Sequence, residues 1–309
     1  MWIHGLKDFK KPLLHLHTQY NKEIPWNEID MDFMNLNQSA HGDREFGHIT
    51  SRLRKPRKVV VGYWNDKDTQ GKIASWMRVC AGWADSQDML IIRFGDNMNN
   101  VAVTDGDKVE AEIRLGYHVD NAPIATLVPY VNAVTEAEID ALVAEYEKVY
   151  DFAADCKKGT EKYQVVRDAA AQEIGLRRFL QDKGAKGFTT SFNELEGMKQ
   201  LMGFASQRLM AEGYGFGAEG DWKSAALVRT MWVMGQGLPG GQSFLEDYTL
   251  NFDGENSTIL QSHMLEINPD ITGVKPRIEV HFLGIGDAGV CARLVFQAHK
   301  GTGVAAVSY

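Results

Sequence analysis

The stretch GFGAEGDW (residues 215–222) sets one carboxylate, Glu219, among three glycines and close to a tryptophan. Glycine is used where a backbone must turn sharply or approach another group closely. The residues YGFGA (214–218) predict a short strand, and Asp221 is a good N-cap for a helix that follows it. Glu219 is therefore expected in a tight connection between a strand and a helix.

The same alternation of strand and helix extends through the preceding part of the chain. Capping signals support two of the helices, because Thr135 and Glu138 form a capping-box pattern and a glycine follows Lys183. Alternating strands and helices are typical of a parallel α/β sheet. An apolar strand is expected in PLLHLHTQY (12–20), an extended stretch at MDFM (31–34), and a hairpin about Asp105-Gly106 in residues 101–119. Further strands are predicted at 58–64, 89–95 and 187–192, and helices at 68–84, 135–150, 161–184 and 203–212.

After Gly240 the pattern becomes β-rich. Residues 242–252 and 257–267 predict an antiparallel hairpin with its turn at DGEN (253–256), and strands are expected in 277–286 and 293–299. The final run GTGVAAVSY (301–309) is also β-like. The predicted fold class is α/β, with Rossmann-like parallel-sheet domains followed by the start of a β-rich, barrel-like C-terminal domain. The predicted domains are the remainder of an N-terminal α/β domain (1–89), a central α/β domain (90–240) and the incomplete beginning of the β-rich domain (241–309).

Composition excludes several classes of function. The formal charge is −8, and the most basic stretch, RLRKPRK (52–58), favours a solvated loop over the alternative of a phosphate-binding patch. No apolar run approaches the roughly 20 residues of a membrane span. The N-terminus lacks the apolar segment of a secretory signal, and three scattered cysteines fit a reducing compartment. These features predict a cytoplasmic protein that binds neither nucleic acid nor membrane.

Glu219 is a candidate ligand-binding residue. In parallel α/β sheets, ligands bind beyond the carboxyl ends of the strands, where Glu219 is expected. The alternative is that Glu219 is part of a helix cap.

The predicted hairpin supplies two partners for this carboxylate. A four-residue loop at Asp253–Asn256 would place Glu246 opposite His263, and a two-residue loop would make them diagonal neighbours on one face. An odd bulge would break this pairing, and a plain hydrogen bond between the two side chains is the alternative to a ligand site. Two carboxylates and one imidazole suit a hard divalent ion such as Mn²⁺. Such an ion polarises a carbonyl group while a carboxylate moves a proton.

Two further motifs suggest ligand binding. The polar stretch NLNQSAHGDREFGHI (35–49) offers Asn37, Gln38 and His41 to a polyhydroxylated ligand, or else is a capped helix start. GIGDAG (284–289) fits the dinucleotide-binding pattern, but no Asp or Glu follows it at the required distance. A dehydrogenase is therefore rejected, and no nucleotide cofactor is expected.

Several long stretches closely resemble the L-arabinose isomerase family, and the resemblance runs essentially from end to end. They are MDFMNLNQSAHGDREFGHI, RFGDNMNNVAVTDGDKV, FTTSFNELEGMKQLMGFASQRLMAEGYGFGAEGDWKSAALVR, GLPGGQSFLEDYT and SHMLEINP. The resemblance implies a Mn²⁺-dependent aldose–ketose isomerase that converts L-arabinose to L-ribulose, and D-galactose to D-tagatose, through a metal-stabilised enediol.

Carried over by position, the family's metal ligands fall on Glu219, Glu246 and His263. The two glutamates are also the implied catalytic proton-transfer pair. The resemblance further implies a trimer-based hexamer in which the NQSAHG loop serves a neighbouring subunit's site. The implied substrate-binding residues are Gln38, His41, Met98, Phe192, Tyr248 and Met264.

The chain also departs from the family pattern. Family chains extend beyond both of its ends, and the family's second metal-binding histidine has no counterpart, because His281 and His299 lie outside the motif. The expectation is a fragment with reduced or no activity. The alternatives are a non-catalytic sugar-binding or assembly remnant of the same family, and an isomerase of another sugar such as fucose.

Overall fold

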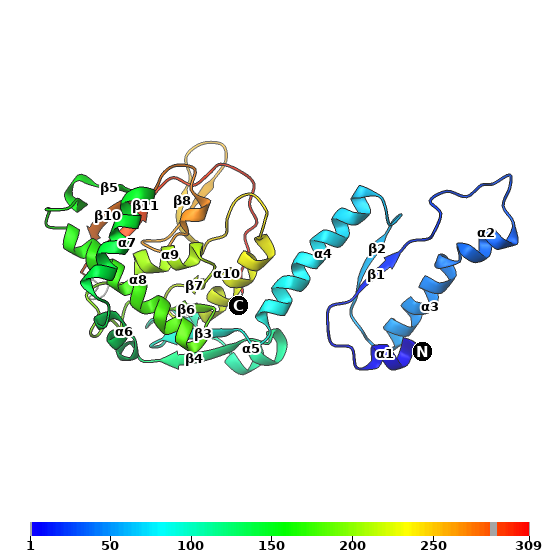
Figure 1. Ribbon diagram of the computed structural model, residues 1–309, viewed down its shortest axis with the longest axis horizontal. Coiled ribbons are helices and arrows are strands. Elements are labelled where there is room, and N and C mark those ends of the chain that lie inside the picture. Colours follow the sequence, from blue (N-terminus) through cyan, green and yellow to red (C-terminus); the bar gives the residue numbers. More distant parts are fainter. Residues whose placement is uncertain (1, 285–288, 309) are drawn as a thin grey trace. The chain divides into compact units, whose positions relative to one another are not determined.

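The computed structural model describes residues 2–284 and 289–308, and the chain falls into two compact units, residues 1–81 and 82–309 (Figure 1). Each unit is considered by itself. Among the described residues, no helix is both long and apolar enough to cross a membrane.

The first unit contains a parallel pair of strands. The predicted strands at 12–20 and 58–64 are confirmed in shorter form, and they pair with Leu14 beside Lys58 and His17 beside Val61. The expected extended stretch at MDFM is wrong, because Asp30 caps a short helix there by accepting from the backbone N–H of Phe33 at 2.8 Å. The elements are α1 (Trp2–Lys7), β1 (Leu14–His17), α2 (Met31–Leu36), α3 (Ser39–Arg52), β2 (Lys58–Val61) and α4 (Lys67–Ser86), whose last residues belong to the second unit.

The second unit is built on a four-stranded parallel sheet in the order β4-β3-β6-β7. This confirms the α/β class that the alternation of strand and helix predicts. Its strands are β3 (Leu90–Phe94), β4 (His118–Ala122), β6 (Gly187–Thr189) and β7 (Gly215–Gly217).

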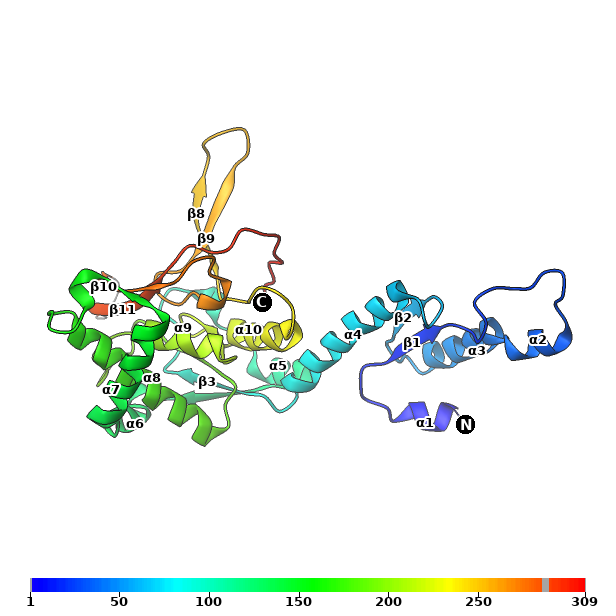
Figure 2. The same ribbon diagram turned by 45° about the horizontal axis from the view of Figure 1, so that its top comes forward.

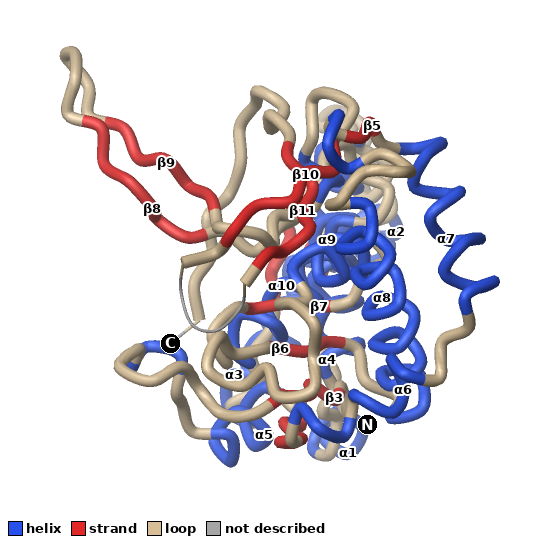
Figure 3. Tube along the Cα trace, turned by 90° about the vertical axis from the view of Figure 1, so that its left-hand side faces the viewer, coloured by secondary structure: helices blue, strands red, loops and turns tan. Residues whose placement is uncertain are grey.

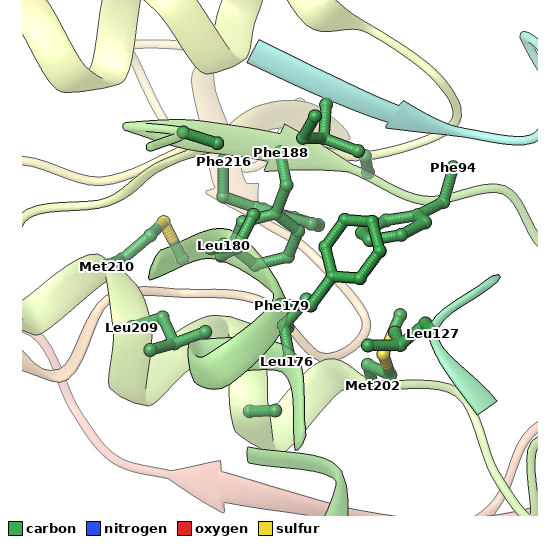
Figure 4. Close-up of a cluster of buried hydrophobic side chains, with 14 of the residues drawn as sticks. Phe94, Leu127, Leu176, Phe179, Leu180, Phe188, Met202, Leu209, Met210 and Phe216 are labelled. Atoms are coloured by element: carbon green, nitrogen blue, oxygen red, sulfur yellow. The ribbon is translucent and has the colours of Figure 1, made fainter. Parts of the chain in front are cut away.

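Helices connect the strands of this sheet. The capping box of Thr135 and Glu138 is present, and Gly184 ends its helix with a φ of 67°. Apolar side chains of α8 and α9 pack against those of the sheet, as Phe179 of α8 does near Phe94 of β3, and within the sheet Phe188 of β6 lies near Phe216 of β7 (Figure 4). The helices are α5 (Lys108–Leu115), α6 (Val128–Asn132), α7 (Glu136–Val149), α8 (Tyr163–Lys183), α9 (Gly203–Ala211) and α10 (Trp222–Gly235), with short 3₁₀ turns at Ala102–Thr104, Ile124–Thr126, Ala154–Cys156 and Pro269–Ile271.

The hairpin expected about Asp105-Gly106 is wrong. Asp107 instead caps α5 by accepting from the backbone N–H of Glu110, and Gly116 ends that helix in the left-handed conformation. The residues between form a helix because the cap and the terminal glycine satisfy its backbone at both ends.

The C-terminal region adds antiparallel strands, as predicted, although a barrel-like arrangement stays a prediction. Strands β10 (Arg277–Phe282) and β11 (Val290–Val295) pair with each other, and β10 also pairs with β5 (Asp151–Phe152). The hairpin of β8 (Glu246–Asn251) and β9 (Thr258–Ser262) projects from the rest of this unit (Figures 2 and 3). The final β-like run is not a strand at residues 301–308, where it is mostly exposed. Residues 285–288 of the GIGDAG motif lie outside the described part.

Candidate metal centre

Glu219 lies in the turn between β7 and α10, where the sequence predicts it. Its backbone is left-handed, with a φ of 61°, a strained conformation for a residue other than glycine. The next residue must be glycine, since a Cβ on Gly220 would lie 2.5 Å from Cα of Asn97. Asp221 then caps α10 by accepting from the backbone N–H of Lys223 and Ser224. The glycines therefore let the loop after β3 close over this turn and fix the position of Glu219.

Glu246 and His263 come from the hairpin. Its outer half has the register of the four-residue loop, with Thr249 opposite Leu260, but a bulge at Tyr248 shifts the inner end so that Glu246 pairs with Ser262. The direct pairing of Glu246 with His263 is therefore wrong. The expectation that a bulge would separate them is wrong too, because His263 follows the end of β9 and its Nε2 lies 3.7 Å from Oε2 of Glu246.

The structure brings Glu219, Glu246 and His263 together. One ligand atom from each residue lies within 4.8 Å of the other two. The imidazole is fixed from behind, since its Nδ1 lies 2.5 Å from Oε2 of Glu266, a fully buried carboxylate. It also packs edge-on against Phe244, with ring centroids 5.2 Å apart. His263 thus presents Nε2 toward the two glutamates in one orientation.

The electrostatics of this cluster are unbalanced. Burial, and next the charge of Glu246, raise the pKa of Glu219 above its usual range. Burial alone would lower the pKa of His263, but the hydrogen bond with Glu266 and the surrounding carboxylates raise it overall. Among the described residues, no lysine or arginine forms an ion pair with Glu219, Glu246 or Glu266. The cluster therefore carries an excess of negative charge in a partly buried place.

These residues fit a divalent cation. His263 Nε2 is buried and has no hydrogen-bond partner in the described structure, an uncommon condition for a buried polar atom. A metal-binding histidine usually donates its other ring N–H to a carboxylate, a backbone carbonyl or water, and His263 bonds the carboxylate of Glu266 in this way. Two carboxylates with one imidazole suit a hard or borderline ion such as Mn²⁺.

Some of the expected substrate-binding residues lie near this cluster. Phe192 is buried, and its ring centroid lies 6.4 Å from that of His263. Met98 and Met264 pack against the group of buried apolar side chains to which Phe192 belongs. Tyr248 is at the bulge of the projecting hairpin and is half exposed.

The other two expected substrate-binding residues belong to the first unit. Gln38 is the N-cap position of α3, and its side-chain nitrogen donates to Asn35 at 3.1 Å. His41 lies in the first turn of α3, is exposed and pairs with Glu45 at 3.3 Å. The roles of Gln38 and His41 in substrate binding stay predictions.

Sequence reasoning missed Glu266 and Phe244. The spacing His-x-x-Glu at 263–266, next to apolar residues, was the available signal for Glu266. Nothing in the sequence marks Phe244, because its contact with His263 depends on how the hairpin joins the α/β body.

Fold and cluster together define an α/β protein with a candidate divalent-metal centre beyond the carboxyl edge of a parallel sheet. Family models for the N-terminal, central and C-terminal domains of L-arabinose isomerase match residues 1–88, 90–237 and 241–308. The chain belongs to the L-arabinose isomerase family.

Individual relatives agree with this assignment. The chain is 68% identical to an L-arabinose isomerase of Bacteroides thetaiotaomicron over 99% of its own length and 62% of the relative's. The values are the same for a protein of that name from Phocaeicola vulgatus. A third L-arabinose isomerase, from Herpetosiphon aurantiacus, is 55% identical over 98% of this chain's length and 61% of the relative's length. The chain thus spans about three fifths of the length of these relatives.

Proposed function

We propose that this chain carries the metal-binding and proton-transfer part of an aldose–ketose isomerase that interconverts L-arabinose and L-ribulose. The observation that carries the proposal is the cluster of Glu219, Glu246 and His263. Nε2 of His263 faces the two carboxylates and has no hydrogen-bond partner in the described structure. Relatives that share 68% of its residues are named for this reaction.

Glu219, Glu246 and His263 would hold one Mn²⁺ ion. When bound, the ion would polarise the sugar's carbonyl group and stabilise the negative charge that develops as the C2 proton leaves. His263 would bind the ion as a neutral imidazole oriented by Glu266, and the nearby apolar side chains of Phe192 and Phe244 would limit the access of water.

The two glutamates would move the protons. One carboxylate removes the proton from C2 of the aldose, and a proton returns to C1, while the hydroxyl proton of O2 is exchanged for one on O1. The atoms balance without an oxidant, so no organic cofactor is required.

The proposal extends to substrate range, assembly and location. D-galactose, which would give D-tagatose, is a second substrate, since it differs from L-arabinose by an added hydroxymethyl group far from the reacting carbons. A trimer-based homo-hexamer in the cytoplasm would let Gln38 and His41 serve a neighbouring subunit. The exposure of His41, and of Leu250 and Phe252 on the hairpin, supports association with further protein.

Ketose formation from L-arabinose by the purified chain, with and without Mn²⁺, tests the proposal. We expect turnover well below that of the full-length Bacteroides relative, dependent on Mn²⁺ and abolished by Glu219→Gln. Because turnover by the short chain could fall below detection, Mn²⁺-dependent binding of L-arabitol, the reduced form of the substrate, is measured alongside it. A chain that neither forms ketose nor binds the polyol in the presence of Mn²⁺ would contradict the proposal.

A further inference from the structure

A second cluster of metal-ligating side chains lies in the first unit, on β1 and α3. His15 and His17 occupy alternate positions of β1, so both imidazoles stand on one face of the strand. Their ring centroids are 4.0 Å apart. Helix α3 places Asp43 against both rings, with 2.8 Å from His15 Nε2 to Oδ1 and 3.8 Å from His17 Nδ1 to Oδ2. One ligand atom from each of the three residues lies within 4.8 Å of the others.

A simple histidine–aspartate hydrogen bond explains only part of this arrangement. It accounts for His15 Nε2 and one oxygen of Asp43. His17 forms no hydrogen bond through either ring nitrogen within the described structure, and its Nε2 is buried. Nδ1 of His15, in a residue only 6% exposed, also has no partner there. Those two unpartnered nitrogens are not the ones that face Asp43. The nitrogen of His17 that does face it, Nδ1, lies 3.8 Å from Oδ2 and forms no hydrogen bond, so the carboxylate satisfies only one of the two rings and an ion between the three side chains would engage the other.

The donors and their surroundings indicate which ligand. Atoms that each lie about 2 Å from an ion are about 3–4 Å from one another, close to the spacing found here. Two imidazoles and one carboxylate form a donor set typical of divalent transition-metal ions and richer in nitrogen than the Glu219 cluster. The ring of Phe46 packs edge-on against His15 at 4.6 Å, and Asp43 and His17 keep 19% and 31% of their side chains exposed. The cluster is thus walled on one side and open to an entering ion on the other.

We propose that His15, His17 and Asp43 bind a divalent transition-metal ion with affinity for imidazole, such as Zn²⁺ or Co²⁺, separately from the Glu219 cluster. The ion joins α3 to β1. Because α3 begins at Ser39, directly after Gln38, the ion fixes the helix whose first turns carry the polar residues of the NQSAHG stretch. This inference does not depend on the proposed isomerase activity, since none of its ligands belongs to the second unit.

Co²⁺ titration of the untagged 309-residue chain, followed by visible absorption, tests the proposal. The background carries Glu219→Gln, Glu246→Gln and His263→Asn, so that the other cluster does not contribute. We expect one bound Co²⁺ per chain and a higher melting temperature with the ion. Asp43→Asn, nearly isosteric, and His17→Gln should each weaken binding at least tenfold. His48→Gln is the matched control, because His48 is an exposed histidine of the same helix.

Some results would overturn the proposal. One is that the background chain is folded, as judged by circular dichroism, but binds no Co²⁺. Another is that Asp43→Asn and His17→Gln leave Co²⁺ binding unchanged. Equal losses with His48→Gln and Asp43→Asn would also overturn it, because binding would then be non-specific. If the background chain does not fold, equilibrium dialysis of Zn²⁺ against the unmodified chain and its Asp43→Asn variant replaces it. A loss of one equivalent then supports the site, and no loss refutes it.

Discussion

Two groups of glutamates in the second unit have opposite surroundings. Glu173 on α8 is fully buried and completely satisfied, because it accepts from Tyr146 at 2.6 Å, from Arg177 at 2.6 Å and from Arg208 at 3.3 Å. Glu219, Glu246 and Glu266 surround one imidazole and have no arginine or lysine paired with them in the described structure. Both groups belong to the second unit.

The difference separates a structural site from a ligand site. Around Glu173 the charges cancel and the carboxylate's hydrogen-bonding capacity is used, which is what a buried ion pair needs for stability. Around Glu219 the charges do not cancel. The backbone of Glu219 itself is left-handed, and Nε2 of His263 has no hydrogen-bond partner in the described structure. Such unresolved features are kept where a ligand completes them.

The largest expected effect on the free energy of unfolding comes from the buried network of Glu173 with Tyr146, Arg177 and Arg208. Glu173→Gln leaves the guanidinium group of Arg208 without its counter-charge and that of Arg177 with only the charge of Glu212, and it should lower the free energy of unfolding by about 3–5 kcal/mol. Urea denaturation in EDTA measures this. Glu212→Gln is the control, because Glu212 pairs with Arg177 at the surface and should cost at most about 1 kcal/mol. Equal effects of the two substitutions would mean that the network is not structural.

A smaller effect is expected from the tyrosine of the same network. Tyr146→Phe removes a buried donor to a carboxylate and should lower the free energy of unfolding by about 1.5–3 kcal/mol. Tyr20→Phe serves as the control, since Tyr20 is 68% exposed and should change stability by less than about 0.5 kcal/mol. A Tyr146→Phe chain as stable as the parent would show that the hydroxyl adds nothing.

Asp85, which is paired with Arg229 and Lys186, and Glu219, which has no cationic lysine or arginine partner in the described structure, should change the stability with pH in opposite directions. Burial would raise the pKa of Asp85, but bonds from Arg229 and Lys186 lower it overall, so its stabilisation is present above the unfolded pKa and lost as pH falls through the folded pKa. The pKa of Glu219 is raised, so the folded state binds the proton more readily, and stability rises as pH falls through the folded pKa.

Urea titrations of Asp85→Asn and Glu219→Gln, compared with the parent between pH 3 and 8 in EDTA, measure both slopes. The stabilisation lost in Asp85→Asn should shrink toward acid pH. The stability gained in Glu219→Gln should shrink toward acid pH as well, because the parent's repulsion is relieved there. A Glu219→Gln chain that is less stable than the parent at neutral pH, by a margin that shrinks on acidification, would contradict the raised pKa.

In the absence of metal, the smallest effect on the free energy of unfolding is expected in the cluster of Glu219, Glu246 and His263. Glu246→Gln removes one of several mutually repelling charges, and the free energy of unfolding in EDTA should change by less than about 1 kcal/mol. The same substitution should abolish most of the stabilisation that added Mn²⁺ gives the parent chain. A large loss in EDTA would mean that Glu246 has a structural role of its own.

Part of this picture follows from the sequence and part does not. The parallel sheet, the capped helices and the place of Glu219 follow from local signals: strand runs, N-caps and glycines that fit one backbone conformation. The error at Asp105-Gly106 arose because Asp-Gly marks a hairpin turn, whereas two residues later Asp107 caps a helix. The bulge at Tyr248 has no local signature, so the exact register of the hairpin could not be predicted.

The candidate site was likewise only partly predictable. Residue types and the even spacing of a hairpin indicated Glu246 with His263, and they meet even though the register differs. The contact of Glu266 with His263 depends on how the chain turns after β9, and that of Phe244 depends on how the hairpin joins the α/β body. The histidine pair of β1 was read only as part of a strand, because its partner Asp43 lies 28 residues from His15.

The measurement that tests the central claim most directly is Mn²⁺ binding, followed by electron paramagnetic resonance of the free ion. The chain carries Asp43→Asn, so that the first unit's cluster does not contribute. The account predicts one bound Mn²⁺ per chain and a loss of at least tenfold in affinity with either Glu219→Gln or His263→Asn, while Glu173→Asp leaves binding unchanged in a chain that remains folded. Equal affinity in the parent and both ligand variants would contradict the assignment of this cluster as the metal centre.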